Sequence, residues 1–213
     1  MTRIVERGCF ITFEGGEGTG KSTQIRLLAD RLEQYGIEVF VTREPGGTPS
    51  GEAIRSLLVT GATDRWLPVT EALMHTAARA EHVKRFIEPA LERGIWVLSD
   101  RFIDSSRAYQ GIGQGLGVPL IDDLTRLAIG DFLPDLTFVL DLPVAAALPR
   151  AQTRPGNEDR YERMGHAFHE RLRQAFLDIA LGEPDRCRII DAAPSIELVA
   201  ERLWDETRQA LLS

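Results

Sequence analysis

The chain has 213 residues, of which 43% are hydrophobic and 27% are charged. This composition excludes an intrinsically disordered protein, because enough apolar surface is available to offset the entropy that ordering costs. The net charge of −7, from 25 Lys and Arg against 32 Asp and Glu, argues against a nucleic-acid partner, since such proteins usually carry a basic stripe.

Short apolar runs suited to strands alternate with longer segments whose apolar residues recur at helical spacing. The predicted strands are residues 9–14, 38–42, 95–99, 136–140 and 188–191. The predicted helices are residues 22–35, 70–93, 120–131, 161–181 and 196–211. This alternation is typical of βαβ units, so we predict one α/β domain, residues 1–213, with a five-stranded parallel sheet and helices on both faces. Ligands of such sheets bind beyond the carboxyl ends of the strands.

The first predicted strand is followed by Gly15-Gly16-Glu17-Gly18-Thr19-Gly20-Lys21-Ser22, which matches G-x-x-x-x-G-K-[ST] at every fixed position. The glycines let consecutive backbone N–H groups turn towards phosphate oxygens, and the N-terminus of the next helix adds a partial positive charge. Lys21 can reach the β- and γ-phosphates, and the Ser22 hydroxyl can ligate Mg²⁺. We therefore predict a fold of the P-loop NTPase type, in which this loop and Thr23 bind a nucleoside triphosphate with magnesium.

Two further sequence blocks follow the second and third predicted strands. The first, from Thr42 to Thr48, reads TREPGGT; the second, from Asp100 to Gly111, reads DRFIDSSRAYQG. Together with the P-loop and Ala77-Ala78-Arg79, these blocks resemble those of bacterial thymidylate kinases, in the same order and over essentially the whole chain. The resemblance implies a homodimeric nucleoside monophosphate kinase that uses ATP and Mg²⁺ to phosphorylate thymidine monophosphate (dTMP) in dTTP synthesis.

The resemblance assigns phosphoryl transfer to Lys21, Asp100 and Arg101. Because the transition state of this transfer is loose and strongly anionic, it needs positioning and charge neutralisation more than covalent chemistry. The resemblance implies that Asp100 acts with Ser22 around the magnesium ion and that Arg101 holds the acceptor phosphate, a task suited to a guanidinium fork. Arg43 is a second candidate for that phosphate. Taken alone, Asp100 has a less favoured alternative, a structural role as a helix cap or as a partner of Arg101.

The resemblance also implies an acceptor pocket. A carboxylate inside the P-loop, Glu17, would meet repulsion from the triphosphate unless it faced elsewhere, and the resemblance directs it to the 3′-hydroxyl of the acceptor sugar. Arg79 lies among alanines and would otherwise be interpreted as a surface residue, but it is implied to hydrogen-bond the thymine edge. Tyr109 is implied to crowd the 2′ position and to favour deoxyribose, while Ser106 and Gln110 line the same pocket.

The segment 150–160 is polar and is broken by Pro155-Gly156, so taken alone it is either a solvated loop or a flap over an anionic ligand. Members of the family carry a catalytic arginine either in the P-loop or in a lid, and here Gly18 occupies the P-loop position. The resemblance therefore implies a mobile lid at about 150–162, whose closure delivers an arginine while it expels water. The sequence leaves open which residue reaches the phosphoryl group: Arg150, Arg154 or Arg160.

One position departs from the family pattern. Four residues before Arg79 the family has a phenylalanine that stacks on the base, and this chain has His75. An imidazole can stack with less apolar contact; alternatively His75 points aside and another ring, such as Phe102, fills the gap. If His75 stacks, its protonation near the ordinary pKa of ~6.5 should weaken dTMP binding. The adenine contacts are expected from the lid and from residues 191–194, largely through backbone atoms.

Two other functions stay open: a related P-loop kinase acting on another deoxynucleotide or a deoxynucleoside, and a P-loop switch that binds nucleotide without transfer. A GTPase is disfavoured, because the chain contains no Asn-Lys-x-Asp motif.

Cys9 and Cys187 match neither a zinc nor a redox spacing, and isolated thiols indicate a reducing compartment. The N-terminal residues lack a signal-peptide core, and no apolar run approaches the ~18 residues of a membrane span, so we expect a cytoplasmic protein without a membrane partner. The alanine-rich residues 72–80 are a candidate for dimer packing.

Overall fold

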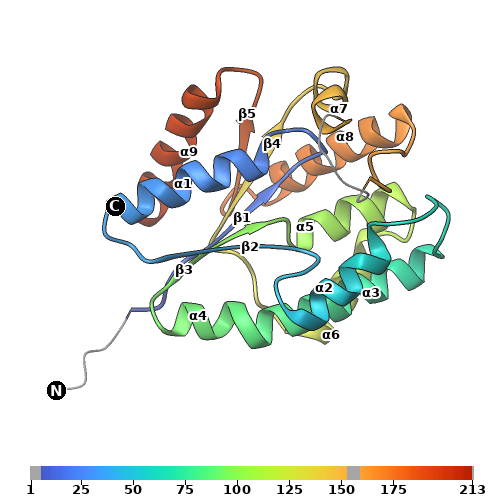
Figure 1. Ribbon diagram of the computed structural model, residues 1–213, viewed down its shortest axis with the longest axis horizontal. Helices are drawn as coiled ribbons and strands as arrows, with labels where there is room; N and C mark the ends of the chain where they lie inside the picture. The colour runs from blue at the N-terminus through green and yellow to red at the C-terminus, as the bar shows by residue number, and fades with distance from the viewer. Residues whose placement is uncertain (1–5, 153–158, 213) are drawn as a thin grey trace.

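The computed structural model describes residues 6–152 and 159–212. They form a central parallel sheet with helices on both faces (Figure 1). The strands are β1 (Phe10–Glu14), β2 (Val39–Arg43), β3 (Trp96–Asp100), β4 (Leu136–Asp141) and β5 (Cys187–Asp191). Their order across the sheet is β2-β3-β1-β4-β5. The predicted α/β fold is confirmed, and each predicted strand matches an observed one to within one residue at either end.

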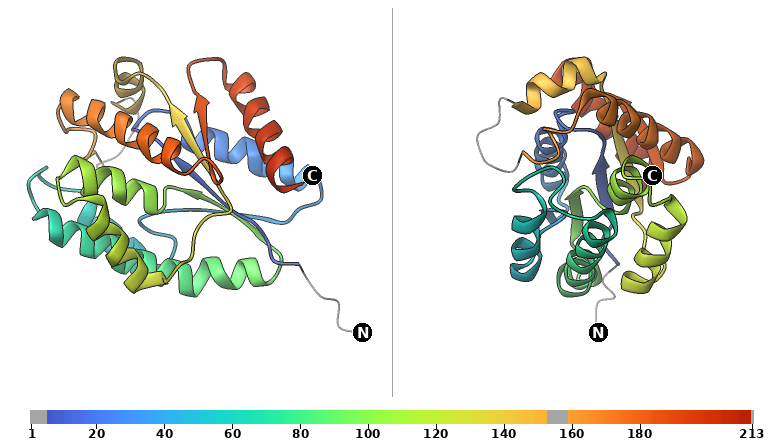
Figure 2. Two further views of the ribbon diagram at one scale, coloured as in Figure 1. Left: turned by 180° about the vertical axis from the view of Figure 1, so that it is seen from behind. Right: turned by 90° about the vertical axis from the view of Figure 1, so that its right-hand side faces the viewer.

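The helices occupy two layers, one on each side of the sheet (Figure 2). The α-helices are α1 (Lys21–Gln34), α2 (Pro49–Leu58), α3 (Pro68–His82), α4 (Glu88–Glu92), α5 (Ile103–Ser106), α6 (Val118–Ile129), α7 (Val144–Gln152), α8 (His166–Gly182) and α9 (Ile196–Leu211). The π-helical segment η1 (Val83–Ile87) joins α3 to α4, and η2 (Arg107–Gly113) extends α5. None of the helices in the described part of the chain is long and apolar enough to cross a membrane.

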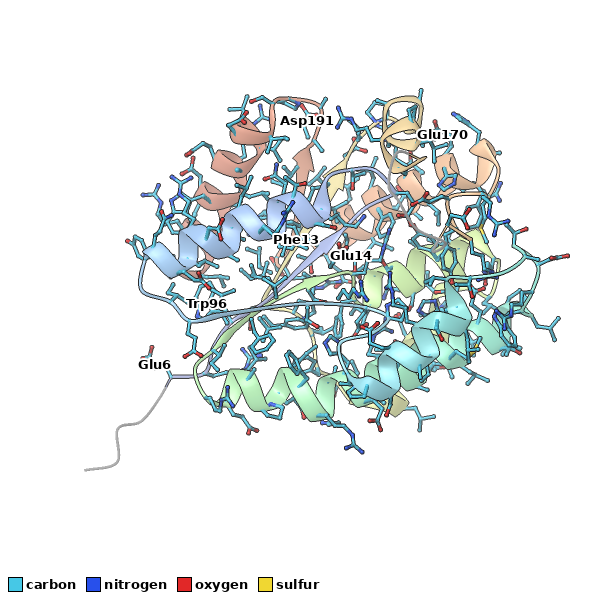
Figure 3. All side chains as sticks on the ribbon, viewed as in Figure 1. Glu6, Phe13, Glu14, Trp96, Glu170 and Asp191 are labelled. Atoms are coloured by element: carbon cyan, nitrogen blue, oxygen red, sulfur yellow. The ribbon has the colours of Figure 1, made fainter. Side chains whose placement is uncertain are left out.

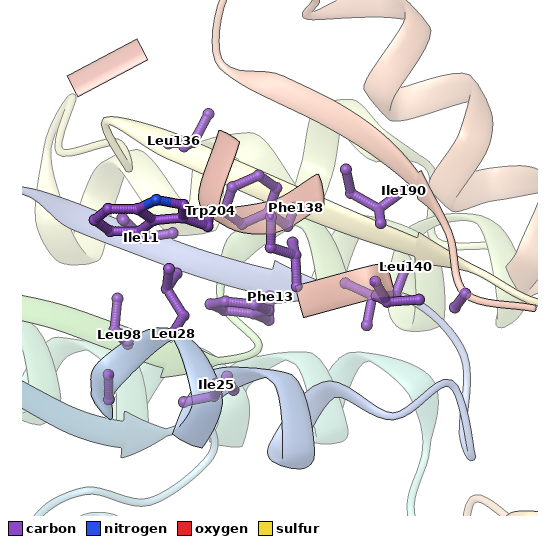
Figure 4. Packing of buried hydrophobic residues seen from close by; sticks show 14 of the residues in the cluster. Ile11, Phe13, Ile25, Leu28, Leu98, Leu136, Phe138, Leu140, Ile190 and Trp204 are labelled. Atoms are coloured by element: carbon purple, nitrogen blue, oxygen red, sulfur yellow. The ribbon is translucent and has the colours of Figure 1, made fainter. Parts of the chain in front are cut away.

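The central strands read as apolar runs because both faces of the sheet are covered. On one face, Ile11 and Phe13 of β1 pack with Ile25 of α1 and Trp204 of α9 (Figure 4). On the other face, Phe10 packs with residues of η1, α4 and α6. This double packing holds the carboxyl ends of β1, β2 and β3 side by side, at the edge where ligands are expected.

Helices α2, α5 and α7 lie outside the predicted ones. A sequence signal for α2 is nevertheless present: the Thr48 hydroxyl accepts a hydrogen bond from the Gly51 N–H (3.0 Å), and Pro49 occupies the first turn. The helix predicted from residue 161 is wrong at its start and begins at His166. Residues 160–164 form a turn instead, because side chains of this segment are held by α3.

Candidate active site

The loop between β1 and α1 has the geometry of a phosphate cradle. Gly18 has a φ of +73°, and a Cβ at this position would lie 2.0 Å from the Ala147 carbonyl oxygen of α7, so no arginine fits there. The Lys21 ammonium lies inside the loop and donates to the carbonyl oxygens of Gly15 (3.1 Å) and Gly16 (2.8 Å). Burial lowers the pKa of Lys21 to about 8. An anion in the cradle would favour the charged form of this ammonium, as the nearby carboxylates of Asp100 and Glu17 already do.

Two oxygen donors meet at the mouth of the P-loop. The Ser22 hydroxyl, at the start of α1, donates to Asp100 Oδ2 at the end of β3 over 2.8 Å. Hydroxyl and carboxylate oxygens suit Mg²⁺, which usually takes its other ligands from waters and substrate phosphates. The described residues contain no cluster of three or more His, Cys, Asp or Glu side chains that could hold a metal alone. Ser22 and Asp100 therefore fit a magnesium ion that is shared with a nucleotide.

Beside the P-loop lies a cavity of about 460 Å³, a volume suited to a small-molecule ligand. The P-loop, the loop after β2, α3 and the residues after β3 contribute to its walls. It is lined by seven of the eight predicted substrate-binding residues: Glu17, His75, Arg79, Arg101, Ser106, Tyr109 and Gln110. The structure thus brings together side chains that are as far apart in the sequence as Glu17 and Gln110.

Glu17 faces this cavity, which is the direction expected from the repulsion argument. Its Oε1 accepts hydrogen bonds from Arg101 (2.8 Å) and from the Tyr109 hydroxyl (2.8 Å). Arg101 also donates to the Tyr109 hydroxyl (3.1 Å) and to the Gly15 carbonyl oxygen (3.1 Å). Burial raises the pKa of Tyr109 well above its ordinary value, so the phenol stays a neutral donor. Arg101 is thereby fixed between the P-loop and the cavity wall.

Arg79 is buried, with 2% of its surface exposed, although its alanine-rich surroundings in the sequence suggest a surface residue. Its Nε donates to Glu44 Oε2 (2.8 Å), and one Nη donates to the Phe102 carbonyl oxygen (3.1 Å) and to the Ser106 hydroxyl (3.0 Å). The other Nη has no hydrogen-bond partner among the described residues. The other oxygen of Glu44, Oε1, lies within hydrogen-bond distance of His82 Nδ1 (3.0 Å). The cavity wall therefore contains a guanidinium that these partners hold in place.

Arg160 is buried and is not directed towards the P-loop. It pairs with Glu71 of α3 over 2.6 Å and donates to the carbonyl oxygens of Leu58, the last residue of α2, and of Ala62 and Thr63 beyond it. The expectation that Arg160 is a lid arginine is therefore wrong for this conformation, because Glu71 and the carbonyl groups already occupy its donors. Glu71 also accepts hydrogen bonds from Gln110 (2.8 Å) and from the Tyr161 hydroxyl (2.9 Å).

His75 is a half-buried part of the cavity wall. Its Nε2 lies 3.1 Å from the Tyr161 hydroxyl, which itself donates to Glu71, so the neutral imidazole donates through Nε2. Burial, followed by the charge of Arg79 and other nearby arginines, lowers the pKa of His75 to about 3. The expected titration near pH ~6.5 is therefore wrong. Phe102 also lines the cavity, with the Arg79 guanidinium over its ring at 5.2 Å from the centroid.

The remaining predicted residues lie apart from this cavity. Arg43 pairs with Glu52 (2.9 Å) on the surface. Arg150 lies in the last turn of α7 and lines a second cavity together with P-loop residues and the predicted adenine-contacting loop: Gly18, Thr19, Gly20, Thr23, Ala192 and Pro194. Arg154 lies outside the described residues, as do the other residues of 153–158 in the expected lid. The sequence gives no role to four supporting residues: Glu44, Glu71 and His82, which are buried, and Tyr161, which is partly buried. Of these, only Glu44 lies within one of the sequence blocks described above.

Comparison with known proteins gives a consistent result. The family model for thymidylate kinase matches residues 13–203. The thymidylate kinase of Caulobacter vibrioides is 55% identical over 205 residues, covering 96% of this chain and 98% of the relative. That of Rhodopseudomonas palustris is 52% identical over 214 residues, covering 97% and 91%. The crystal structure of thymidylate kinase from Ehrlichia chaffeensis is similar with a TM-score of 0.77 at 36% identity, covering 94% of this chain and 98% of that one.

Proposed function

Because the chain belongs to the thymidylate kinase family, ATP-dependent phosphotransferases that act on dTMP, we propose that its P-loop binds ATP with Mg²⁺ and that the adjoining cavity binds dTMP. The observation that carries this proposal is the meeting of Glu17, Arg79 and Arg101 in one cavity of about 460 Å³ beside the P-loop. A nucleoside monophosphate offers a base, a sugar hydroxyl and a phosphate, and these three side chains offer a partner for each.

On the acceptor side, the unused Nη of Arg79 donates to an oxygen of the thymine edge. Glu17 accepts from the sugar 3′-hydroxyl, and Tyr109 closes the space that a 2′-hydroxyl would need. Arg101 lies nearest the P-loop, where it donates to the acceptor phosphate and directs it towards the donor. Ser106 and Gln110 hold the pocket through their hydrogen bonds to Arg79 and Glu71.

On the donor side, the backbone N–H groups of the P-loop and the Lys21 ammonium bind the β- and γ-phosphates. Ser22 and Asp100 hold Mg²⁺, which supplies charge neutralisation for the transferred group when it is bound. Arg150 is the described lid arginine on the donor side, beside the second cavity. We propose that it, or Arg154, comes to the phosphoryl group when the lid closes. Arg43 remains a weaker candidate for the acceptor phosphate, since Glu52 holds it on the surface.

We also propose a homodimer and a cytoplasmic location. Within the alanine-rich residues 72–80, Ala72 and Ala78 are buried within the subunit and Ala77 is exposed, so only part of this stretch is free to pack against a second copy. The packing surface that we propose extends beyond it. It consists of apolar side chains exposed on α3 and α6: Val69, Leu73 and Leu127. A cytoplasmic location agrees with the use of ATP and a nucleotide as substrates.

A coupled assay for ADP tests the assignment. With ATP and Mg²⁺, dTMP should give the highest kcat/KM among dTMP, UMP, dCMP and dGMP, and thymidine should give no turnover because it lacks the phosphate that Arg101 holds. A higher kcat/KM for a nucleoside would instead indicate a deoxynucleoside kinase. Nucleotide binding without consumption in the presence of every acceptor would indicate a switch.

A further inference from the structure

Glu14 is a fully buried carboxylate at the end of β1 for which the proposed function has no role. Figure 3 labels it where β1 reaches helix α5. Its Oε1 accepts hydrogen bonds from the backbone N–H groups of Phe102 (2.8 Å) and Ser105 (3.2 Å), and its Oε2 accepts one from the Ser105 hydroxyl (2.6 Å). All three donors belong to the turn that follows β3, which carries Arg101. A buried carboxylate that accepts three bonds from one turn holds that turn in a defined position.

The turn needs such support, because Arg101 is strained. Its φ is +75°, and it is the one non-glycine residue with a positive φ in the described part of the chain. A residue with a side chain is unfavourable in the left-handed region and persists there only where surrounding contacts enforce it. The contacts here are on both sides: the Ser99 hydroxyl donates to the Arg101 carbonyl oxygen (2.8 Å), and the next N–H, that of Phe102, donates to Glu14.

Glu14 also reaches the guanidinium of Arg101 through one side chain. The Ser105 hydroxyl donates its hydrogen to Glu14 and accepts a hydrogen bond from the same Arg101 Nη that donates to the Gly15 carbonyl oxygen (3.0 and 3.1 Å). The carboxylate thus fixes the direction of the Ser105 hydroxyl so that its lone pair faces Arg101. Both the backbone and the side chain of Arg101 are therefore set by Glu14.

We propose that Glu14 is a positioning residue for the acceptor phosphate: through the Phe102 N–H and Ser105 it holds Arg101 in the strained conformation that presents the guanidinium to that phosphate. This inference rests on the proposed function, in which Arg101 binds the phosphate of dTMP. Its consequence is specific. Loss of Glu14 should weaken the contact to the phosphate more than the contact to the base, since Arg79 is held by Glu44, which lies in the loop after β2 and outside the segment that Glu14 supports.

The electrostatics agree with this arrangement. Burial and the nearby Asp104 raise the pKa of Glu14 to about 7, while the hydrogen bonds from Ser105 and Phe102 and the charge of Arg101 act in the opposite direction. The ionised form of this buried group therefore depends on the same donors that it positions.

The test compares the affinities of dTMP and thymidine, which differ only in the phosphate, by calorimetric titration of the full chain. Glu14→Gln keeps the shape and one acceptor oxygen but turns an amide N–H towards the Ser105 hydroxyl. It should weaken dTMP binding by about 10-fold or more, the scale of a lost charge-assisted hydrogen bond, and change thymidine binding by less than about twofold. Ser105→Ala, which cuts only the side-chain connection, should give the same pattern with a smaller loss.

Thr207→Val is the matched control, because Thr207 is a buried polar residue whose hydroxyl donates to the Leu203 carbonyl oxygen within α9 (2.8 Å), away from Arg101. It should leave the ratio of the two affinities unchanged. An equal weakening of both ligands by Glu14→Gln, or an unchanged ratio, overturns the inference; if that variant does not fold, an unchanged ratio in Ser105→Ala overturns it. Arg101→Ala separates this failure from that of the proposed function: if it too leaves the ratio unchanged, Arg101 does not bind the phosphate at all.

Discussion

The donor and acceptor halves of the site are built in different ways. The P-loop is nine consecutive residues, 15–23, and it works through backbone N–H groups, a helix N-terminus and one lysine. The acceptor cavity takes its side chains from several distant segments. Three carboxylate–arginine pairs hold that cavity together: Glu44–Arg79 and Glu71–Arg160 are buried, and Glu17–Arg101 is partly buried.

This difference predicts how substitutions affect each half of the site. A phosphate cradle has a local geometry that recurs wherever a strand, a glycine-rich turn and a helix follow one another. A cavity made of buried ion pairs depends on the whole fold, because each charge is acceptable only while its partner stays in place. Removal of one partner should therefore affect stability in the acceptor half and turnover in the donor half.

Arg160→Met gives the largest expected effect. It leaves Glu71 buried without its cation, which costs about 3–5 kcal/mol of unfolding free energy. Arg126→Met, at an exposed pair with Asp123, should cost at most about 1 kcal/mol and serves as the control. Urea unfolding measures both. If Arg160→Met keeps the wild-type stability but loses turnover, Arg160 acts as a catalytic lid arginine and not as the partner that stabilises Glu71.

Lys21→Ala should act on turnover instead. Loss of one preorganised charge contact to the transferred group lowers kcat by roughly 10²–10³-fold, or about 2.7–4 kcal/mol. The affinity for dTMP should be nearly unchanged, because Lys21 does not line the acceptor cavity. Lys84→Ala, at an exposed pair with Glu88, should leave both quantities as in the wild type. Steady-state kinetics measure kcat for each variant. A near-normal kcat in Lys21→Ala would contradict the proposal that the P-loop binds ATP.

His75→Phe has the smallest expected effect. A phenyl ring should tighten dTMP binding by about 0.5–1.5 kcal/mol if residue 75 stacks on the base, with little change for ATP. Because the pKa of His75 is about 3, this gain should not vary between pH 6 and 8. Calorimetry at both pH values checks it, and equal dTMP affinities in the two proteins would show that residue 75 does not stack.

The free energy of unfolding should depend on pH below about 6.5, a range in which dTMP binding is not expected to change. The unfolded chain protonates His75 below pH ~6.5, whereas the folded protein keeps the ring neutral down to about pH 3. Protons therefore favour the unfolded state in this window, and the wild type should lose stability relative to His75→Phe as the pH falls from 6.5. Urea midpoints measured at pH 7 and pH 5 give the comparison.

The sequence by itself determined the strands, the order of βαβ units and the P-loop, because each rests on local periodicity or on contiguous residues. It also placed the acceptor residues through the resemblance, but it could not say which arginines are buried. Arg79 and Arg160 each look exposed from their sequence neighbours, and each is buried because a carboxylate distant in the chain meets it.

The tertiary structure alone decided these pairings, since a buried charge is stable only where the fold supplies its counter-charge. The same reason explains why Glu14, Glu44, Glu71 and Tyr161 were not foreseen. Each acts through the hydrogen-bond donors that it contacts. Glu14 accepts hydrogen bonds from the residues after β3, and Glu71 pairs with Arg160. Such contacts exist only after packing has brought α3, η2 and the turn before α8 together around one cavity.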